Sequence, residues 1–392
     1  MKIVIIPSGF KECLDAEEVA IAMEKGIRRL DPYANIEIIP MIDGGEGFAK
    51  TLVHMKGGTL IQREVTGPVG KKVLSHFGVF QENGVTTAVI EMAAVAGLKL
   101  VPRHMRNPLR TTTYGVGELI REALDLHVDR ILIGCGDSGT SDGGAGMAQA
   151  LGVRFIGYDK QLLPILGGGD LLNIAEIDQT RLDPRLHQVK IDVACNWHNI
   201  LCGDLGVARV FGPQKGASPR EVALLSSGYD HYANLIKNVT GMDLRYVPGS
   251  GASGGLGAGL VAFAGATLHS RFDIIMNYIN IEQHMGDADL VLTAEGCLDE
   301  QTPYGKIPSE VARIAKRFSV PVIAITGTIG KGADANYNSG IDAYMSIIQK
   351  PTTLEKAMLK ASVWIEDSAE AALRQIRIGV QITERKYKGQ LV

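Results

Sequence analysis

The chain of 392 residues favours two domains, because one domain typically takes about 100–200 residues. Its residues are 45% apolar and 21% charged, the balance of an ordinary globular protein, which excludes wholesale disorder. Forty basic against 43 acidic side chains leave a net charge of −3, so we expect neither a nucleic-acid partner nor a polybasic membrane anchor. Five scattered cysteines, with no long apolar stretch or signal peptide in view, favour a cytoplasmic protein. The oligomeric state stays open, a homo-oligomer included.

The N-terminal segment predicts a βαβ unit. Lys2–Pro7 is a β-branched run typical of a strand buried on both faces. Asp15–Leu30 repeats apolar residues at helical spacing, and Asn35–Pro40 predicts a second strand. A strand, a helix and a strand in succession favour a parallel sheet with right-handed crossovers.

The middle of the chain predicts a different sheet. Strand-like runs at Thr59–Val65, Lys72–Phe80 and Thr86–Ala93 are separated by short turns, which is typical of an antiparallel meander. A predicted helix at Gly117–Leu126 precedes another short buried strand at Arg130–Ile133, which could belong to either domain.

The C-terminal third returns to alternating strands and helices, which predicts an α/β fold with two domains. A Rossmann-like parallel-sheet domain is expected from residues 1–57 together with 285–392, and a mixed α/β domain of residues 58–284 is inserted into it. The predicted C-terminal elements are strands at Asp289–Thr293, Val320–Thr326 and Ala343–Ile348, and helices at Pro308–Phe318 and Leu354–Ile376.

Six glycine-rich loops carry charged or hydroxyl residues, mostly at the carboxyl ends of predicted strands, where α/β sheets bind their ligands. In the first loop, Lys11 stands at the start of a helix and can meet an anion together with the free helix amides, or can simply be solvated. In the second, Asp43 and Glu46 lie among glycines, a pattern that suits a metal or a general base but also a plain turn.

The third loop, Gly134–Gly144, formally matches the dinucleotide expression G-x-G-x-x-G. A second match at Gly249–Gly254 shows how weak that expression is in a glycine-rich chain. Acidic and hydroxyl side chains in the third loop can hold Mg²⁺, which then bridges phosphates, so we predict a phosphate cradle with metal assistance. Its polar side chains are Asp137, Ser138, Thr140 and Asp142.

The remaining three loops add cations, amides and carboxylates. The fourth presents Lys215 on a rigid Gly-Pro turn. The fifth, Gly249–Gly259, has small residues whose backbone amides suit an anion or adenosine. The sixth, Ala294–Asp299, places a carboxylate pair at a strand end, and Lys306 follows closely.

Other motifs offer weaker hypotheses. The sequence has no Walker A, kinase catalytic-loop or H-E-x-x-H pattern. Cys195, His198 and Cys202 form a weak zinc candidate, because no second ligand pair accompanies them. A dinucleotide-dependent oxidoreductase would need an acid about 20 residues past the glycines, and Asp159 there falls in a predicted turn.

Several segments in the order found here also occur together in one known family. They are Asp43-Gly44-Gly45-Glu46-Gly47, Val65-Thr66-Gly67-Pro68, Ile90-Glu91-Met92-Ala93-Ala94, Asn107-Pro108-Leu109, Gly115-Val116-Gly117-Glu118-Leu119-Ile120, Asp142-Gly143-Gly144-Ala145-Gly146-Met147, Phe211–Ala217 and Gly254-Gly255-Leu256-Gly257. Through them the chain resembles the bacterial glycerate kinase family, of the D-glycerate 2-kinase type, over nearly its whole length. The resemblance implies a two-domain α/β fold with the active site in the interdomain cleft, ATP with Mg²⁺ as phosphoryl donor, and a small hydroxy acid as acceptor.

The loops supply each part that phosphoryl transfer needs: a phosphate cradle, a metal held by carboxylates, cations and a base. The predicted catalytic residues are Lys11, Asp43, Glu46 and Asp299. The predicted substrate- and phosphate-binding residues are Ser138, Thr140, Gly143, Gly144, Asn196, Gln214, Lys215, Gly251, Ser253, Gly254 and Lys306. The predicted metal ligands are Asp137, Asp142 and Glu295. We expect the acids Asp43, Glu46, Asp142 and Asp299 to converge on one cleft.

Four positions depart from the pattern of the family. Ser8 and Asn196 each stand where the family has an aspartate, Asp137 adds an acid, and Cys297 replaces an arginine. These changes leave three hypotheses: glycerate phosphorylation, a kinase with an altered acceptor, and a ligand-binding regulator that has lost activity.

Overall fold

The computed structural model describes residues 1–10, 13–41 and 44–388, with side chains up to residue 385. The chain forms two compact units, the first from Met1–Ile42 with Met276–Val392 and the second from Asp43–Ile275. The chain therefore passes from the first unit to the second after residue 42, earlier than the boundary expected after residue 57. The reason is helix α2 (Phe48–Met55), which packs on the sheet of the second unit.

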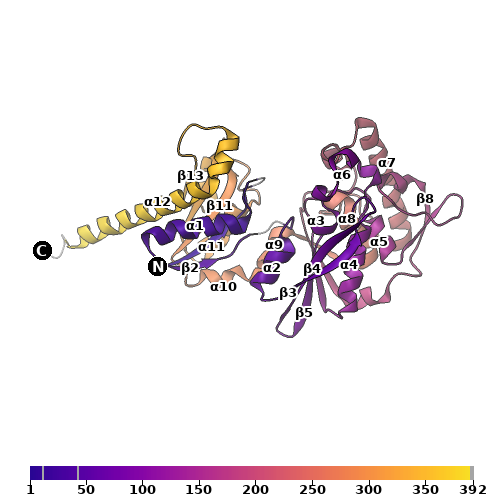
Figure 1. Cartoon of the computed structure of the whole chain (residues 1–392), viewed down its shortest axis with the longest axis horizontal. Helices are drawn as coiled ribbons and strands as arrows, with labels where there is room; N and C mark the ends of the chain where they lie inside the picture. The colour runs from indigo at the N-terminus through magenta and orange to yellow at the C-terminus, as the bar shows by residue number, and fades with distance from the viewer. Residues whose placement is uncertain (11–12, 42–43, 389–392) are drawn as a thin grey trace. The chain divides into compact units, whose positions relative to one another are not determined.

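The first unit is built on a sheet of five parallel strands in the order β13-β12-β11-β1-β2 (Figure 1). Helix α1 (Ala16–Leu30) packs against helix α12 (Leu354–Lys388), and both contribute to one core over this sheet. The predicted parallel α/β arrangement is confirmed. The strands are β1 (Lys2–Pro7), β2 (Asn35–Ile38), β11 (Leu290–Leu298), β12 (Val322–Ile329) and β13 (Ala343–Ser346), and the other helices are α10 (Ile281–Met285), α11 (Ile307–Arg317) and the 3-10 helix η7 (Ala333–Ser339).

Helix α1 shows why the local sequence prediction succeeds here. Asp15 accepts a hydrogen bond from the backbone N–H of Glu18, whose side chain accepts one from the N–H of Asp15, which makes a capping box. Its apolar face then meets the β-strands of the same unit, where Ile3 and Ile5 are fully buried.

The second unit holds a mixed sheet of six strands in the order β10-β9-β6-β5-β4-β3. Strands β3, β4 and β5 pair antiparallel as the predicted meander, whereas β5, β6, β9 and β10 are parallel. Strand β6, whose domain the sequence leaves open, belongs to this sheet. The bounds are β3 (Thr59–Thr66), β4 (Lys72–Glu82), β5 (Val85–Glu91), β6 (Arg130–Gly134), β9 (Lys190–Cys195) and β10 (Thr267–Ser270), and a small antiparallel pair is formed by β7 (Arg154–Gly157) and β8 (Ile174–Asp178).

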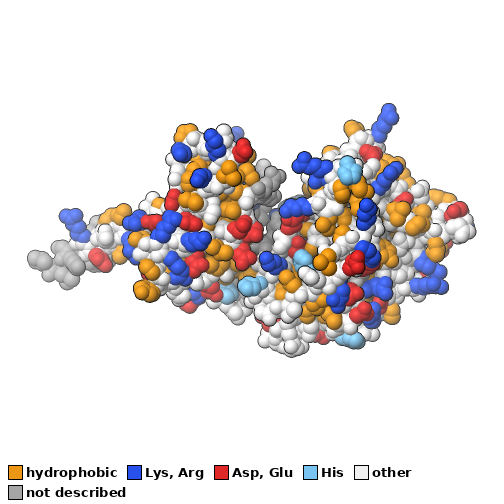
Figure 2. Space-filling view, in the orientation of Figure 1, with side chains coloured by type: hydrophobic (Ala, Val, Ile, Leu, Met, Phe, Trp, Pro, Cys, Tyr) orange, Lys and Arg blue, Asp and Glu red, His pale blue; other side chains and the backbone are white. Residues whose placement is uncertain are grey.

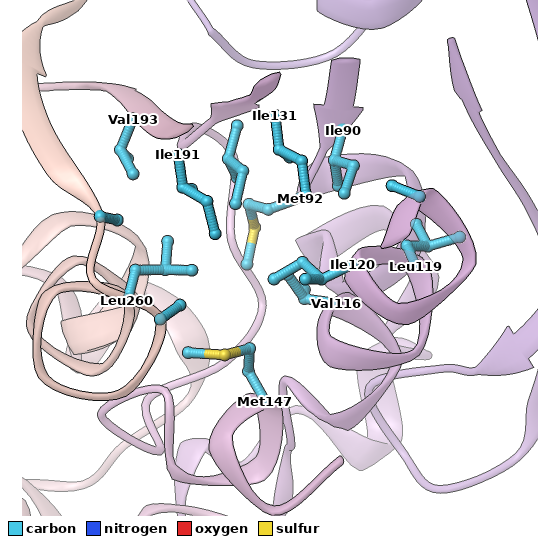
Figure 3. Packing of buried hydrophobic residues seen from close by; sticks show 14 of the residues in the cluster. Ile90, Met92, Val116, Leu119, Ile120, Ile131, Met147, Ile191, Val193 and Leu260 are labelled. Carbon is cyan, nitrogen blue, oxygen red and sulfur yellow. The ribbon is translucent and has the colours of Figure 1, made fainter. Parts of the chain in front are cut away.

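Helices cover this sheet and enclose its core. Figure 3 shows Val116 and Ile120 from helix α4, Met147 from α5 and Leu260 from α8 meeting the strand residues of the sheet. The long helix α7 lies outside the expected elements. The α-helices are α2, α3 (Ala93–Ala96), α4 (Tyr114–Asp125), α5 (Ala145–Ala150), α6 (Val207–Phe211), α7 (Pro219–Thr240), α8 (Ala252–Ala264) and α9 (Arg271–Ile279), which continues into the first unit. The 3-10 helices are η1 (Leu98–Leu100), η2 (Arg103–Met105), η3 (Pro108–Arg110), η4 (Gly168–Asn173), η5 (Pro184–Gln188) and η6 (Pro213–Lys215).

The surface and the helix lengths agree with the composition. Acidic and basic side chains are interspersed over the visible face of each unit (Figure 2), as expected for a net charge of −3. Within the described part of the chain, no helix combines the length and apolar character that crossing a bilayer requires.

Candidate active site

Glycine-rich segments far apart in the sequence meet at the carboxyl ends of the parallel strands in the second unit. The backbone N–H of Glu46 donates to Asp137 Oδ2 at 3.1 Å, which joins the second loop to the third. The N–H of Gly143 donates to the carbonyl of Gly254 at 3.0 Å, which joins the third loop to the fifth. Lys215 of the fourth loop also reaches the third, so four of the six predicted loops form one cluster.

Lys215 is the buried cation of this cluster. Its ammonium donates to Ser138 Oγ at 2.8 Å and to the carbonyl of Thr140 at 2.6 Å, and the residue is only 2% exposed. Burial, opposed in part by the charge of Asp142, lowers the pKa of Lys215 to about 7. A buried ammonium with two neutral acceptors is suited to take an anionic ligand as its counter-charge.

The turn that carries Lys215 is fixed by its sequence. Pro213 opens the 3-10 helix η6, and Gly216 ends it with φ +99°, a left-handed conformation that favours glycine. A Cβ at Gly216 would overlap the carbonyl of Arg106, so this position also needs the missing side chain. Gln214, predicted to bind substrate, lies in the same turn and is exposed.

Two residues with hydroxyl side chains contact the Lys215 ammonium, Ser138 through its hydroxyl and Thr140 through its carbonyl. Ser138 is half-buried and accepts its hydrogen bond, whereas the hydroxyl of Thr140 is fully buried and has no hydrogen-bond partner among the described residues. A buried hydroxyl without a partner is rare in folded proteins and commonly marks a functional position. Both residues therefore remain candidates for phosphate binding.

Asp142 has a different role from the predicted metal ligand. Its side chain is fully buried and accepts hydrogen bonds from the N–H groups of Thr113, Gly144 and Gly146, and from the Thr113 hydroxyl. Burial raises its pKa despite these donors. With its oxygens surrounded by protein donors, Asp142 organises the loop and the start of α5, and this environment leaves no place for Mg²⁺.

The glycines of the expected anion cradle bind protein atoms instead of presenting free amides. The N–H of Gly143 is taken by Gly254, that of Gly144 by Asp142, and that of Gly251 by the carbonyl of Asn199. These glycines let the loops approach one another, and the N–H groups of Gly143, Gly144 and Gly251 are engaged within the protein. Ser253 and Gly254 lie in the same turn, both with positive φ.

Glu91 belongs to the cluster but is absent from the predicted site residues. It ends strand β5, is 3% exposed, and accepts hydrogen bonds from the N–H groups of Gly47 and Ala49 at the start of α2. Burial raises its pKa to about 7 against these two donors, and the nearby Glu46 and Asp137 raise it further. The available signal was an acid at the end of the apolar strand Thr86–Ala93.

The predicted residues of the first unit include one ion pair. Asp299 pairs with Lys306 at 2.9 Å. Partial burial raises the pKa of Asp299, but the Lys306 ammonium and nearby hydrogen-bond donors lower it more, so the pKa lies below its usual value. Glu295 and Cys297 do not lie in a loop, because strand β11 continues through Leu298 and pairs with β12 up to Ile329. The sixth predicted loop is thus largely strand, extended by the ladder with β12.

The remaining predicted positions lie as follows. Ser8 is buried, and its hydroxyl donates to the carbonyl of Ala294 at 2.9 Å. Asn196 directly follows β9 and accepts from the N–H of His198 at 3.1 Å. Lys11 and Asp43 lie outside the described residues. Glu46 of the second loop and Asp142 of the third occur in the same loop cluster.

Metal and dinucleotide chemistry are constrained by the same geometry. Among the described residues, no group of three or more His, Cys, Asp or Glu side chains could hold a metal ion. Cys195, His198 and Cys202 therefore form no such group, and the zinc hypothesis gains no support. Asp159 lies in a turn of the small β7–β8 pair, as predicted.

Comparison with known proteins identifies the family. A sequence model described as the glycerate kinase family matches residues 3–377. The chain is 47% identical over 351 residues to a glycerate kinase of Haemophilus influenzae, covering 89% of this chain and 92% of that protein. It is 44% identical over 357 residues to a glycerate 2-kinase of Escherichia coli, covering 91% and 93%. The chain belongs to the glycerate kinase family. A crystal structure assigned as a glycerate kinase 2 from Salmonella typhimurium LT2 matches with a TM-score of 0.84 and 43% identity, covering 97% of this chain and 99% of that one.

Membership of the glycerate kinase family confirms the resemblance seen in the sequence motifs. The chain is an enzyme of the kinase class, and its mixed α/β fold is that of a glycerate kinase. The dinucleotide-dependent oxidoreductase gains no support, because the glycine expression at Gly134–Gly139 lies in a loop cluster of a kinase family member.

Proposed function

We propose that this enzyme transfers a phosphoryl group from ATP, with Mg²⁺, to a hydroxyl of glycerate, converting D-glycerate to 2-phosphoglycerate. The observation that carries the proposal is the buried Lys215, which lies where the glycine-rich loops of the second unit meet. The chain also matches glycerate kinases over nearly its whole length. An ATP-dependent kinase draws on the cytoplasmic nucleotide pool, so the proposal also places the enzyme in the cytoplasm.

The proposed roles follow from chemistry and position. Phosphoryl transfer is catalysed mainly by positioning and by charge stabilisation of the transferred group. Lys215 supplies positive charge in a dry environment, where it acts more strongly than in water. Ser138 and Thr140 are placed to donate to phosphate or carboxylate oxygens next to it. Glu46, half-exposed at the end of its segment, is the candidate base for the acceptor hydroxyl.

The second unit can accommodate Mg²⁺ without a cage of protein ligands. Mg²⁺ usually keeps several waters and is held by one or two carboxylates together with substrate phosphates. Asp137 is exposed beside Ser138, so its carboxylate can serve in this way, whereas the enclosed Asp142 cannot. When bound, the ion would neutralise charge that develops on the phosphate oxygens.

A coupled ADP-release assay tests the proposal directly. Purified enzyme is given ATP, Mg²⁺ and D-glycerate, and in parallel L-glycerate and a panel of other small hydroxy acids and polyols. We expect ADP release that depends on D-glycerate and is abolished by a chelator, and ³¹P NMR should identify 2-phosphoglycerate. ADP release with another acceptor but not with glycerate would replace glycerate as the proposed acceptor. ADP release with none of the acceptors would contradict the proposed function.

Asn196 favours a second candidate, a kinase with a shifted acceptor. An amide has no useful proton affinity near pH 7, so Asn196 cannot serve as a base where the family pattern has an aspartate. Its Oδ1 accepts from the N–H of His198, a bond that an aspartate would keep, so Asn196→Asp should preserve the turn. Improved D-glycerate turnover in Asn196→Asp would support the shifted acceptor. D-glycerate turnover by the wild type as fast as that of Asn196→Asp would favour the plain glycerate kinase.

A further inference from the structure

Glu91 connects the glycine-rich segment Gly44–Gly47 to the sheet. Its Oε1 accepts from the N–H of Gly47 at 2.9 Å, and its Oε2 accepts from the N–H of Ala49 at 3.1 Å. The side chain is nearly inaccessible, at 3% exposure. Both carboxylate oxygens of Glu91 are thus engaged with the backbone that follows Glu46.

Two exposed side chains also contact this segment. Glu46 forms an ion pair with Lys99, but the Lys99 side chain is 80% exposed and that of Glu46 is 40% exposed. Exposed ion pairs contribute little, because water screens them and two long side chains must be ordered. The Glu46 N–H also donates to the exposed Asp137. The two bonds to Glu91 are the buried ones among these contacts, so they attach the segment where water does not compete.

We propose that Glu91 is a positioning residue: it fixes Gly44–Gly47 at the carboxyl end of β5 and so holds Glu46 in the geometry that turnover requires. This inference rests on the proposed kinase function, in which Glu46 is the candidate base. A carboxylate suits the task because it offers an acceptor oxygen to each of the two N–H groups. A glutamine offers one carbonyl oxygen and turns donor hydrogens toward the other N–H, and a methionine offers no comparable acceptor.

The test compares Glu91→Gln and Glu91→Met with a control that contacts the other end of strand β5. Asp129, an exposed residue just before β6, accepts from the N–H of Thr86 at 2.8 Å at the opposite end of β5, so Asp129→Asn neutralises a carboxylate that bonds the same strand far from the segment. Hydrogen exchange of the peptide covering residues 44–52 measures the attachment itself, independently of activity. Initial-rate kinetics then separate kcat from the KM values for ATP and for the acceptor.

We expect exchange at Gly47 and Ala49 to accelerate at least tenfold in Glu91→Gln and more in Glu91→Met, and not in Asp129→Asn. We expect kcat to fall at least tenfold in Glu91→Gln, with the KM for ATP within twofold of wild type and a cooperative thermal transition retained. Should Glu91→Met fail to fold, Glu91→Gln decides. Unchanged exchange, or an effect on KM alone, overturns the inference. If the wild type transfers no phosphoryl group, the proposed function fails instead, and the exchange result still decides whether Glu91 holds the segment.

Discussion

Burial of the Lys215 ammonium lowers the stability of the fold, although the charge would favour an anionic ligand. An ammonium that is 2% exposed and has no carboxylate within salt-bridge distance among the described residues is costly to bury. The pKa of about 7 expresses that cost, since one pKa unit corresponds to about 1.4 kcal/mol between the charged and neutral forms. Residues retained against stability in this way are typical of functional sites.

Replacing Lys215 by methionine should therefore damage turnover. The variant keeps the length and apolar stem of the side chain but loses the charge and both hydrogen bonds. We expect the loss of transition-state binding to reach at least about 1.5–3 kcal/mol, the scale of a charge-assisted hydrogen bond, measured as kcat/KM. Lys237, which is 53% exposed on α7, provides the control Lys237→Met. Rates within twofold of wild type in Lys215→Met would reduce Lys215 to a structural residue.

The same variant should change how folding stability depends on pH. The pKa of Lys215 is lowered from 10.5 in the unfolded chain to about 7 in the folded protein, so between these values the unfolded state binds the extra proton. The stability of the wild type should therefore rise with pH in that range. Below about pH 7 the full free-energy cost of burying the charged Lys215 is present. Relative to Lys215→Met, the wild type should gain about 2 kcal/mol between pH 7 and pH 9 in urea unfolding. Parallel pH profiles for the two proteins would contradict the buried-cation interpretation.

At the scale of elements, the non-helical turn at the start of α8 holds two loops together. Ser253, Gly254 and Gly255 all have positive φ, an unusual left-handed run inside a segment that is otherwise helical. The carbonyl of Gly254 accepts from the N–H of Gly143 and from the hydroxyl of Tyr229, which also donates to Ser141. A close approach of backbones is therefore part of how this site is built.

Gly254→Ala should destabilise the protein well beyond the strain of the left-handed conformation. A Cβ at Gly254 would overlap the carbonyl of Thr140, the atom that Lys215 binds. Gly265 ends α8 with φ +64° and has nothing within 4 Å of an added Cβ, so Gly265→Ala is a matched control. We expect about 1–2 kcal/mol for the control and at least ~1–3 kcal/mol more for Gly254→Ala in urea unfolding, with reduced kcat. Equal losses in the two variants would show that the contact with Thr140 is unimportant.

At the scale of the whole molecule, the two units differ in the parts of the chain that form them. The second unit comes from one continuous stretch, Asp43–Ile275, and contains two buried clusters of its own. The first unit needs both ends of the chain, since its core combines α1 with α12 and strands from each end. Only the second unit is therefore expected to fold as a continuous fragment.

A fragment of residues 43–275 tests this expectation. We expect far-UV circular dichroism of a mixed α/β protein and one cooperative thermal transition, because the buried clusters lie wholly inside the fragment. A fragment of residues 276–392 lacks β1 and α1 and should not melt cooperatively. A disordered 43–275 fragment would mean that its clusters depend on the first unit.

Features encoded by local pattern were predictable from the sequence. Helix α1 carries its own capping box and apolar face, and the turns of the β3–β4–β5 meander lie between alternating strands. The order of the motifs was enough to indicate the glycerate kinase family. The sequence analysis missed helix α7 because its glycine-rich surroundings suggested loops. The available signal was the capping box that Ser218 and Glu221 form at its start.

What the tertiary structure decided is which polar residues of the loops are enclosed and which stay available. Asp137 and Asp142 look alike in the sequence, yet one is exposed and the other is surrounded by donors from Thr113 and the start of α5. Likewise Glu91 became part of the site only through the amides of Gly47 and Ala49. Burial and hydrogen-bond partners come from segments that are distant along the chain, so no local pattern contains them. The sequence determined the strands and helices whose local pattern is clear and the chemical types at the loop positions, and long-range packing determined the role of each side chain.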